Sequence, residues 1–173
     1  MSDAPRTGAT GGPPPQVCGD SGILTRVGAE DAAMGLRVMT VELVNCGTEP
    51  YRLNGYPRIR VLDKARRPLA VEIGHGTAGI ATIEKFDPPA RPVTLRAGER
   101  ATVGLVWRNT VTLSDVPAAE GRFIEITLPD GQPRQVVAAD LDLGNTGRLG
   151  VSAWAVPTVE SGPASGSPSR PSR

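Results

Sequence analysis

The feature that most constrains the fold is the short spacing of turn signals between apolar segments. Glycine contributes 21 of the 173 residues and proline 17, and both interrupt helices and favour turns. The segments between them alternate apolar and polar residues, most clearly at Arg100–Asn109. One face of that segment carries Ala101, Val103, Leu105 and Trp107. This two-residue period is typical of a strand with one buried face.

The same pattern predicts an all-β protein. Turn signals recur about every 8–12 residues, and no segment shows the period of an amphipathic helix. We therefore expect an antiparallel two-sheet, immunoglobulin-like sandwich of about eight or nine strands. The sandwich domain is expected at residues 17–156. Residues 1–16 are expected to form a flexible N-terminal linker and residues 157–173 a disordered C-terminal tail, because both are rich in Gly, Pro or Ser.

Two local predictions concern the first half of the chain. The stretch from Gly28 to Gly35 is expected to be a brief helical turn or loop. The strand Leu36–Asn45 has a split apolar phase, since Met39, Val41 and Leu43 share one face while Leu36 and Val38 fall on the other. Either a bulge near Val38 reconciles the two phases, or the strand is buried on both sides at its start.

The stretch Asn45–Asp63 is expected to form a corner around which the strands are arranged. Asn54-Gly55 is a hairpin-type turn signal, because both residue types tolerate positive φ. Pro57 suits the start of a strand or an edge. After it, Ile59 and Val61 alternate with Arg58 and Arg60, which predicts a strand with one buried and one wet face.

Charge and hydropathy exclude two classes of partner. The formal net charge is +1, so no basic field is available for nucleic acid. The chain has no run of about 18 apolar residues, so no transmembrane segment is expected. Nor does an apolar leader follow Met1. We therefore expect either a cytosolic protein or a mature form that lacks its signal sequence.

The chain resembles a known family in the order of its motifs. Asn45-Cys46-Gly47 and the following stretch Tyr51–Pro57 are similar to a motif of the actinobacterial domain of unknown function 4232 (DUF4232). Three later segments, Leu95–Glu99, Leu105–Asn109 and Asp142–Val151, are similar to the same family. The resemblance covers nearly all of residues 17–156. It implies an extracytoplasmic β-sandwich, usually secreted or lipid-anchored, and it implies no enzymatic activity.

The two cysteines bear on the same question. Cys18 and Cys46 flank the first pair of predicted strands, and in an exporting cell they would form a disulfide. It would close a loop of about 29 residues and stabilise the fold by about 3–4 kcal/mol. The alternative is two unpaired, buried thiols in a cytosolic protein. Each cysteine stands beside a glycine in a turn, which favours the bridge. We therefore expect an extracytoplasmic location, with residues 2–16 as the spacer after a lipid anchor at the N-terminus.

The sequence contains few features that would indicate an enzyme or a metal site. His75 is the only histidine, and the chain has no Gly-x-Ser-x-Gly elbow, so we expect no enzyme. No convergent set of metal ligands is visible, and Gly74-His75-Gly76 lacks the context of a nucleotide cradle. The sequence Asp140-x-Asp142-x-x-Asn145 is weakly similar to a calcium loop but lacks its central Gly and distal Glu. No metal and no cofactor are expected.

Partner contact is the remaining role. Arg58 and Arg60 lie on the wet face of one predicted strand, Tyr56 lies in the corner, and His75 begins the long irregular segment Gly74–Arg91. These four residues are the predicted contacts with a partner, either an envelope protein or a cell-wall component. The alternative function is a small-ligand or carbohydrate binder that uses the Gly74–Arg91 loop, because long loops are often functional.

Overall fold

The structure is a computed structural model that describes residues 18–157 except Lys85, Leu113 and Asp130. The described part contains ten strands and no helix. The strands are β1 (Ile23–Ala33), β2 (Leu36–Asn45), β3 (Tyr51–Leu53), β4 (Arg58–Leu62), β5 (Glu72–His75), β6 (Val93–Leu95), β7 (Arg100–Arg108), β8 (Ala119–Thr127), β9 (Gln135–Gly144) and β10 (Arg148–Val151). The all-β prediction is confirmed. Apart from Pro157, the predicted tails lie outside the described residues.

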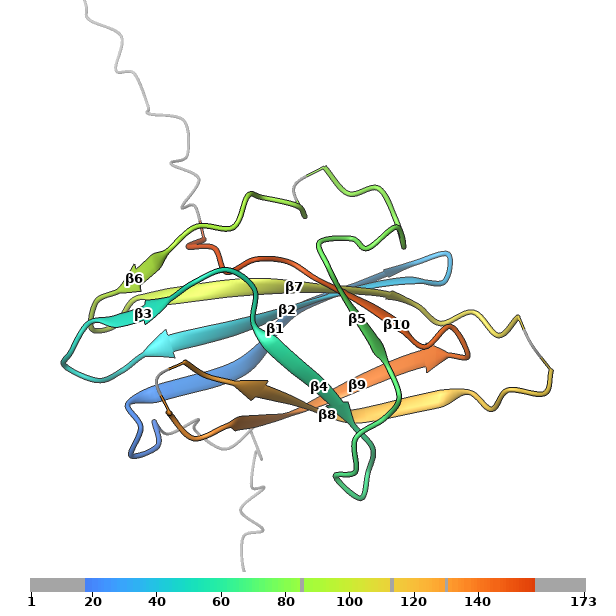
Figure 1. The fold of residues 1–173 in the computed structure, drawn as a ribbon, viewed down its shortest axis with the longest axis horizontal. Coiled ribbons are helices and arrows are strands. Elements are labelled where there is room, and N and C mark those ends of the chain that lie inside the picture. Colours follow the sequence, from blue (N-terminus) through green and yellow to red (C-terminus); the bar gives the residue numbers. More distant parts are fainter. Residues whose placement is uncertain (1–17, 85, 113, 130, 158–173) are drawn as a thin grey trace, which may run out of the picture.

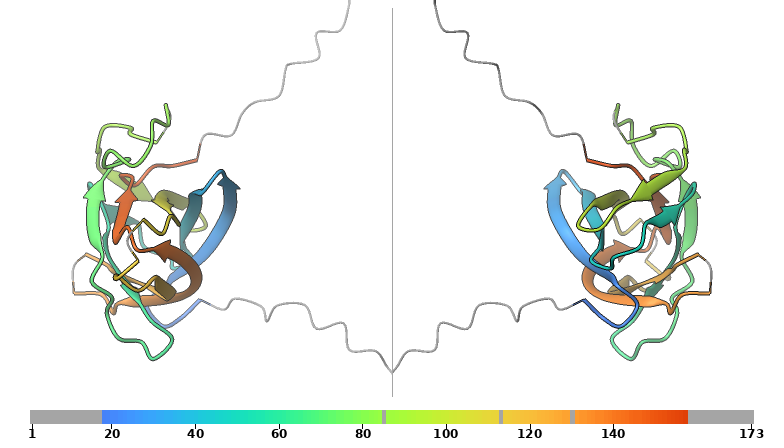
Figure 2. Two further views of the ribbon diagram at one scale, coloured as in Figure 1. Left: turned by 90° about the vertical axis from the view of Figure 1, so that its right-hand side faces the viewer. Right: turned by 90° about the vertical axis from the view of Figure 1, so that its left-hand side faces the viewer.

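The strands form two facing sheets and a small ribbon (Figures 1 and 2). The larger sheet has the order β1-β2-β7-β10-β5, and the sheet that faces it has the order β4-β8-β9. The ribbon pairs β3 with β6 at one end of the molecule. The pairs within these sheets are antiparallel except β10–β5, which is parallel. The architecture is that of an open sandwich.

The core lies between the two sheets and is aliphatic. The inward residues of β2 and β7 are buried with those of β4, β8 and β9 in one cluster. Strands β4 and β7 alternate as the sequence predicts. Along β7, for example, Ala101, Val103, Leu105 and Trp107 are at most 2% exposed. Removal of this apolar surface from water is the main force that holds the layers together.

The first hairpin corrects the prediction of a helical turn or loop at Gly28–Gly35. Instead β1 continues to Ala33, and the turn consists of Met34 and Gly35 with φ of 49° and 80°. The bulge lies on β1, between Val27 and Glu30, and not near Val38. Strand β2 pairs with β7 without a register shift. Leu36 and Val38 are half-buried on the outer face, which explains the split apolar phase.

The corner at Asn45 is held by one buried amide. Asn45 is 2% exposed, and its Nδ2 donates to the carbonyls of Glu49 and Leu95 at 2.8 and 2.9 Å. Its Oδ1 accepts from the backbone N–H of Gly47 at 3.0 Å. The amide therefore fixes the end of β2 to the end of β6 and closes the turn between β2 and β3.

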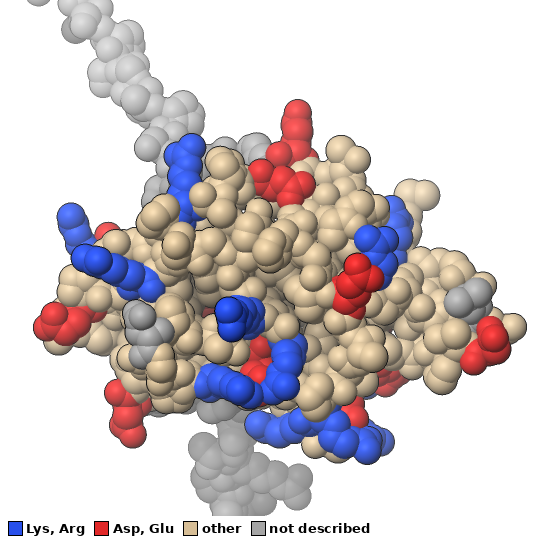
Figure 3. Space-filling view, viewed as in Figure 1, with Lys and Arg blue, Asp and Glu red and all other residues tan. Residues whose placement is uncertain are grey.

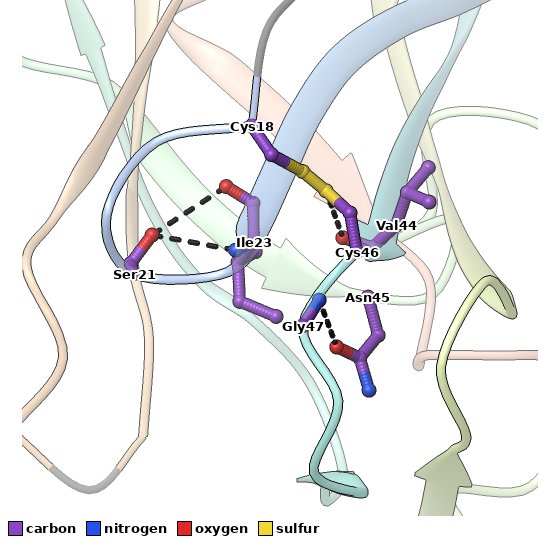
Figure 4. The surroundings of a disulfide bond; sticks show 7 residues. All are labelled: Cys18, Ser21, Ile23, Val44, Asn45, Cys46 and Gly47. Carbon is purple, nitrogen blue, oxygen red and sulfur yellow. Dashed lines mark hydrogen bonds between the residues drawn. A yellow bond between two sulfur atoms is a disulfide. The ribbon is translucent and has the colours of Figure 1, made fainter.

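A disulfide joins Cys18 to Cys46 beside this corner (Figure 4). Their Cα atoms are 6.4 Å apart. The carbonyl of Gly22 accepts from the backbone N–H groups of Cys46 and Gly47 at 2.9 and 3.0 Å. The bridge therefore ties the start of β1 to the end of β2, where backbone hydrogen bonds already hold the two segments together.

The long segment after β5 is a cover for the larger sheet. Phe86 is 7% exposed and lies against Gly104 of β7, where an added Cβ would stand 2.6 Å from the ring. Asp87 accepts from the Thr77 backbone N–H at 3.0 Å and from its hydroxyl at 3.2 Å. Arg108 and Arg148 donate to the carbonyls of Ile80 and Ala78. The segment is thus fastened to the outer face of this sheet.

Candidate functional site

An open groove lies where the β3–β6 ribbon meets the β4–β8 end of the facing sheet. Its volume is about 620 Å³, within the range of roughly 300–1,000 Å³ found for small-molecule sites. It is lined by residues 52–54, 56–58, 92–94 and 127–129, together with Trp154. None of the described residues between 74 and 91, the range that the sequence suggested as a ligand-binding loop, lines it.

The walls of the groove are fixed by backbone hydrogen bonds. The N–H of Trp154 donates to the carbonyl of Gly55 at 3.0 Å, so the Asn54–Gly55 turn is anchored to the C-terminal segment. Ala155 exchanges two backbone hydrogen bonds with Thr102 of β7, at 2.7 and 3.0 Å. The turn that separates Arg52 from Arg58 therefore stands on the larger sheet, and the groove is preformed.

The floor of the groove is apolar. Leu53, Val93, Leu128 and Trp154 line it, and each is at most 9% exposed. Each belongs to the core cluster as well. These side chains are held in place by close packing in the core. They therefore form a rigid floor and do not move up to fill the groove.

Two arginines also line the groove, each opposite a threonine on the neighbouring strand. In the β3–β6 register Arg52 faces Thr94, and in the β4–β8 register Arg58 faces Thr127. All four residues are exposed and line the groove. Directly opposed residues of an antiparallel pair share one face of the sheet, so each guanidinium has a hydroxyl as its neighbour and not a carboxylate.

The neighbouring arginine shows the contrast. Arg60, also on β4, faces Glu125 of β8 and forms an ion pair with it at 2.6 Å. Arg134 shares the same carboxylate at 3.4 Å. Figure 3 shows basic side chains along β4 and the turn after it, with few acidic groups among them. The side chains of Arg52 and Arg58 make no hydrogen bond or ion pair to any residue that the structure describes.

The predicted contact residues divide between the groove and its edge. Arg58 and Tyr56 line the groove, and Arg60 lies outside it in its ion pair with Glu125. His75 stacks flat on Tyr56, with ring centroids 3.9 Å apart and an interplanar angle of 1°. Its ring makes no hydrogen bond to a described residue. The stack therefore supports the tyrosine from the β5 side.

The acidic residues that weakly resemble a calcium loop are partnered by other side chains. Asp140 pairs with Arg122 at 2.6 Å. Asp142 accepts from Trp107, Arg37 and Asn109 at 3.0–3.2 Å. Burial raises the pKa of Asp142, but the hydrogen bonds from Trp107, Asn109 and Arg37 lower it more, and the net shift is downward. No group of three or more potential metal-ligating side chains converges among the described residues.

Sequence reasoning missed Arg52, Thr94, Thr127 and Trp154. The two threonines sit opposite arginines only in the folded register, which alternation within one strand does not predict. Trp154 lies beyond the last strand, since β10 ends at Val151. The signal available in the sequence was Arg52 itself, an arginine two residues before the Asn54–Gly55 turn.

Comparison with known proteins gives one match. The family model described as "Domain of unknown function (DUF4232)" matches residues 18–155. No curated protein and no solved structure matches the chain. Within the described residues, the structure contains no helix long and apolar enough to cross a membrane. Since the match spans most of the chain and includes the groove and the disulfide, this protein belongs to the DUF4232 family.

Proposed function

We propose that this domain is a non-catalytic, extracytoplasmic binding module that holds an envelope protein or cell-wall component in the groove. The observation that carries the proposal is the groove itself, which is preformed and has an apolar floor and two arginines without a described carboxylate partner. Its lining supplies donors and apolar surface. It supplies no carboxylate, imidazole or thiol among the described residues, and these groups most often act as general bases or nucleophiles.

The disulfide supports the proposed extracytoplasmic location. Disulfides persist in oxidising compartments and are rare in the cytosol. Cell fractionation with alkylation of free thiols tests this point. We expect the protein in the envelope or medium, with Cys18 and Cys46 protected from alkylation until a reductant is added. Recovery from the cytosolic fraction with both thiols alkylated would refute the extracytoplasmic location.

Capture of a partner tests the binding role. The whole protein is immobilised and exposed to an envelope extract of the cells that make it, beside an Arg52→Gln/Arg58→Gln variant and an Arg67→Gln control. Arg67 is exposed and lies in the turn beyond the other end of β4, paired with Asp63 at 3.0 Å. We expect the wild type and the control to retain the same component and the groove variant to lose it. Equal recovery by all three proteins would contradict the proposal.

A further inference from the structure

The groove combines three features that together select a class of ligand. They are two guanidinium groups without described carboxylate partners, a hydroxyl beside each, and a buried apolar floor between them. We infer that the groove binds an amphiphilic anion, that is, a molecule with a phosphate or carboxylate group joined to an apolar segment. This inference rests on the proposed function, because it names the chemistry of the group held at that same site.

The arginines are the first argument. Some other arginines of the domain are paired with carboxylates, among them Arg26 with Glu42 at 2.6 Å and Arg37 with Asp142 at 3.0 Å, whereas Arg108 donates to a backbone carbonyl. On β4 the register determines which arginine has a carboxylate opposite it, because Glu125 lies opposite Arg60 and Thr127 lies opposite Arg58. A guanidinium presents several donors in a planar fork that matches carboxylate and phosphate oxygens. An incoming anion therefore meets two forks that do not have to break an existing ion pair.

The threonines are the second argument. A hydroxyl donates one hydrogen bond and rotates to suit its acceptor. Thr94 and Thr127 occupy the cross-strand positions beside Arg52 and Arg58, one pair on the ribbon and one on the β4–β8 sheet. Each wall of the groove thus offers a charged donor and a neutral donor together. Both threonines are exposed, so their hydroxyls are available to a ligand.

The floor is the third argument, and it distinguishes an amphiphile from a simple anion. An inorganic anion would use the arginines and threonines but not the apolar part of the lining, which includes Leu53, Val93 and Leu128. A neutral sugar would leave both guanidinium groups without a counter-charge. An apolar segment laid on the floor is stabilised because its own apolar surface is removed from water. A ligand with both parts uses the whole lining.

Amide-resolved NMR titration of the whole protein tests the inference. The probes are n-octyl phosphate and octanoate, which separate the two anionic groups, with inorganic phosphate and n-octyl β-glucoside as controls, all below their micelle concentrations. We expect at least one of the two amphiphilic anions to shift the amides of residues 52–58, 93–94 and 127–128. We also expect it to bind at least about 10-fold more tightly than either control.

Variants show whether the arginines carry the effect. Arg52→Gln and Arg58→Gln should each weaken binding of the anionic probe by about 10-fold, whereas Arg67→Gln should leave it within about 2-fold. Glutamine keeps most of the side chain length, and both sites are exposed, so amide spectra like those of the wild type are expected. Equal weakening by Arg67→Gln would overturn the inference, because the effect would then be one of overall charge.

Failure of this inference can be told apart from failure of the proposed function. If octyl glucoside shifts the same amides as tightly as both anions do, the groove binds ligands but does not select anions, and only the inference fails. If no probe shifts those amides and partner capture is unchanged in the groove variant, the inference and the proposed function both fail.

Discussion

At the scale of single residues, Asp142 shows how one carboxylate can serve both sheets. Trp107 is 2% exposed, and its Nε1 donates to Asp142 Oδ1 at 3.1 Å. Asn109 and Arg37 donate to Oδ2 at 3.0 Å each. A buried indole N–H that lacked a hydrogen-bond acceptor would lower the stability of the fold. The carboxylate of β9 therefore completes the hydrogen bonding of a core tryptophan on β7.

The lowered pKa of Asp142 gives a pH dependence with a definite sign. Since the folded pKa lies below the ordinary value of 3.8, the carboxylate stabilises the fold above about pH 4, and this stabilisation is lost as the pH falls through the folded pKa. The Asp142 side chain is 50% exposed, so solvent screens its interactions, and we expect Asp142→Asn to lower the free energy of unfolding by about 0.5 kcal/mol at pH 7. The difference from the wild type should shrink below pH 4. Urea unfolding at pH 7 and pH 3 measures both values.

A variant on the same strand provides the control. Asp140 also points outward and pairs with Arg122, but its side chain is 81% exposed. An exposed ion pair contributes little to stability, so Asp140→Asn should leave the free energy of unfolding nearly unchanged at both pH values. Equal effects of the two substitutions would show that the hydrogen bonds to Trp107 and Asn109 do not set the stability.

At the scale of elements, the β1–β2 hairpin carries strain at its tip. Met34 is fully exposed and adopts φ of 49°, a conformation that costs roughly 1–2 kcal/mol for most residues. Asparagine tolerates it, and Asn-Gly is the preferred sequence of such a turn. We expect Met34→Asn to raise the free energy of unfolding by about 0.5–1 kcal/mol, measured by urea unfolding. Met34→Leu keeps the strained backbone and should leave the free energy of unfolding unchanged. A loss of stability in Met34→Asn would contradict the assignment of strain to residue 34.

The elements that the sequence predicts correctly are those with one buried face. Strands β2, β4 and β7 alternate because one side packs on the opposite sheet. The second half of β1 escaped prediction because its residues from Gly28 to Ala33 are exposed, so no apolar period marks them. The parallel β5–β10 pair joins Glu72 to Arg148, and nothing local in either segment specifies so distant a partner.

The candidate site was predictable in part for the same reason. Arg58 and Tyr56 stand out within their own segment, as a charged residue on a wet strand face and an aromatic residue in a corner. The groove depends on pairing between segments, because Arg52 meets Thr94 and Arg58 meets Thr127 only in register. Alternation identifies which face a residue occupies. It does not identify which residue stands opposite.

At the scale of the whole molecule, the segment after β10 connects the layers. Ser152 and Ala155 bond to Gly104 and Thr102 of the larger sheet, and Trp154 bonds to Gly55 of the groove turn. The ring of Trp154 belongs to the core cluster and lines the groove. Both cysteines lie in the N-terminal half, so the C-terminal half is held by packing and hydrogen bonds without a disulfide. Through the segment after β10, the packing of the C-terminal half extends to the groove.

Substitution of Trp154 should therefore affect stability and binding to different degrees. Trp154→Ala removes a ring that is 5% exposed and should cost about 3–5 kcal/mol in the free energy of unfolding, a large share of the roughly 5–15 kcal/mol typical of a domain. Trp154→Phe should cost less and leave a folded protein with a deeper groove. Val156→Ala, at a residue 54% exposed, should cost almost nothing.

The three variants separate a structural role from a role in the groove. In Trp154→Phe, amide hydrogen exchange should accelerate at residues 54–58 while residues in the middle of β2 and β7 stay protected, because the turn rests on the Trp154 segment and the central strands do not. Binding of whichever amphiphilic anion the groove takes, n-octyl phosphate or octanoate, should weaken in step with that local opening. If exchange accelerates equally in β2 and β7, Trp154 stabilises the domain as a whole and does not specifically shape the groove.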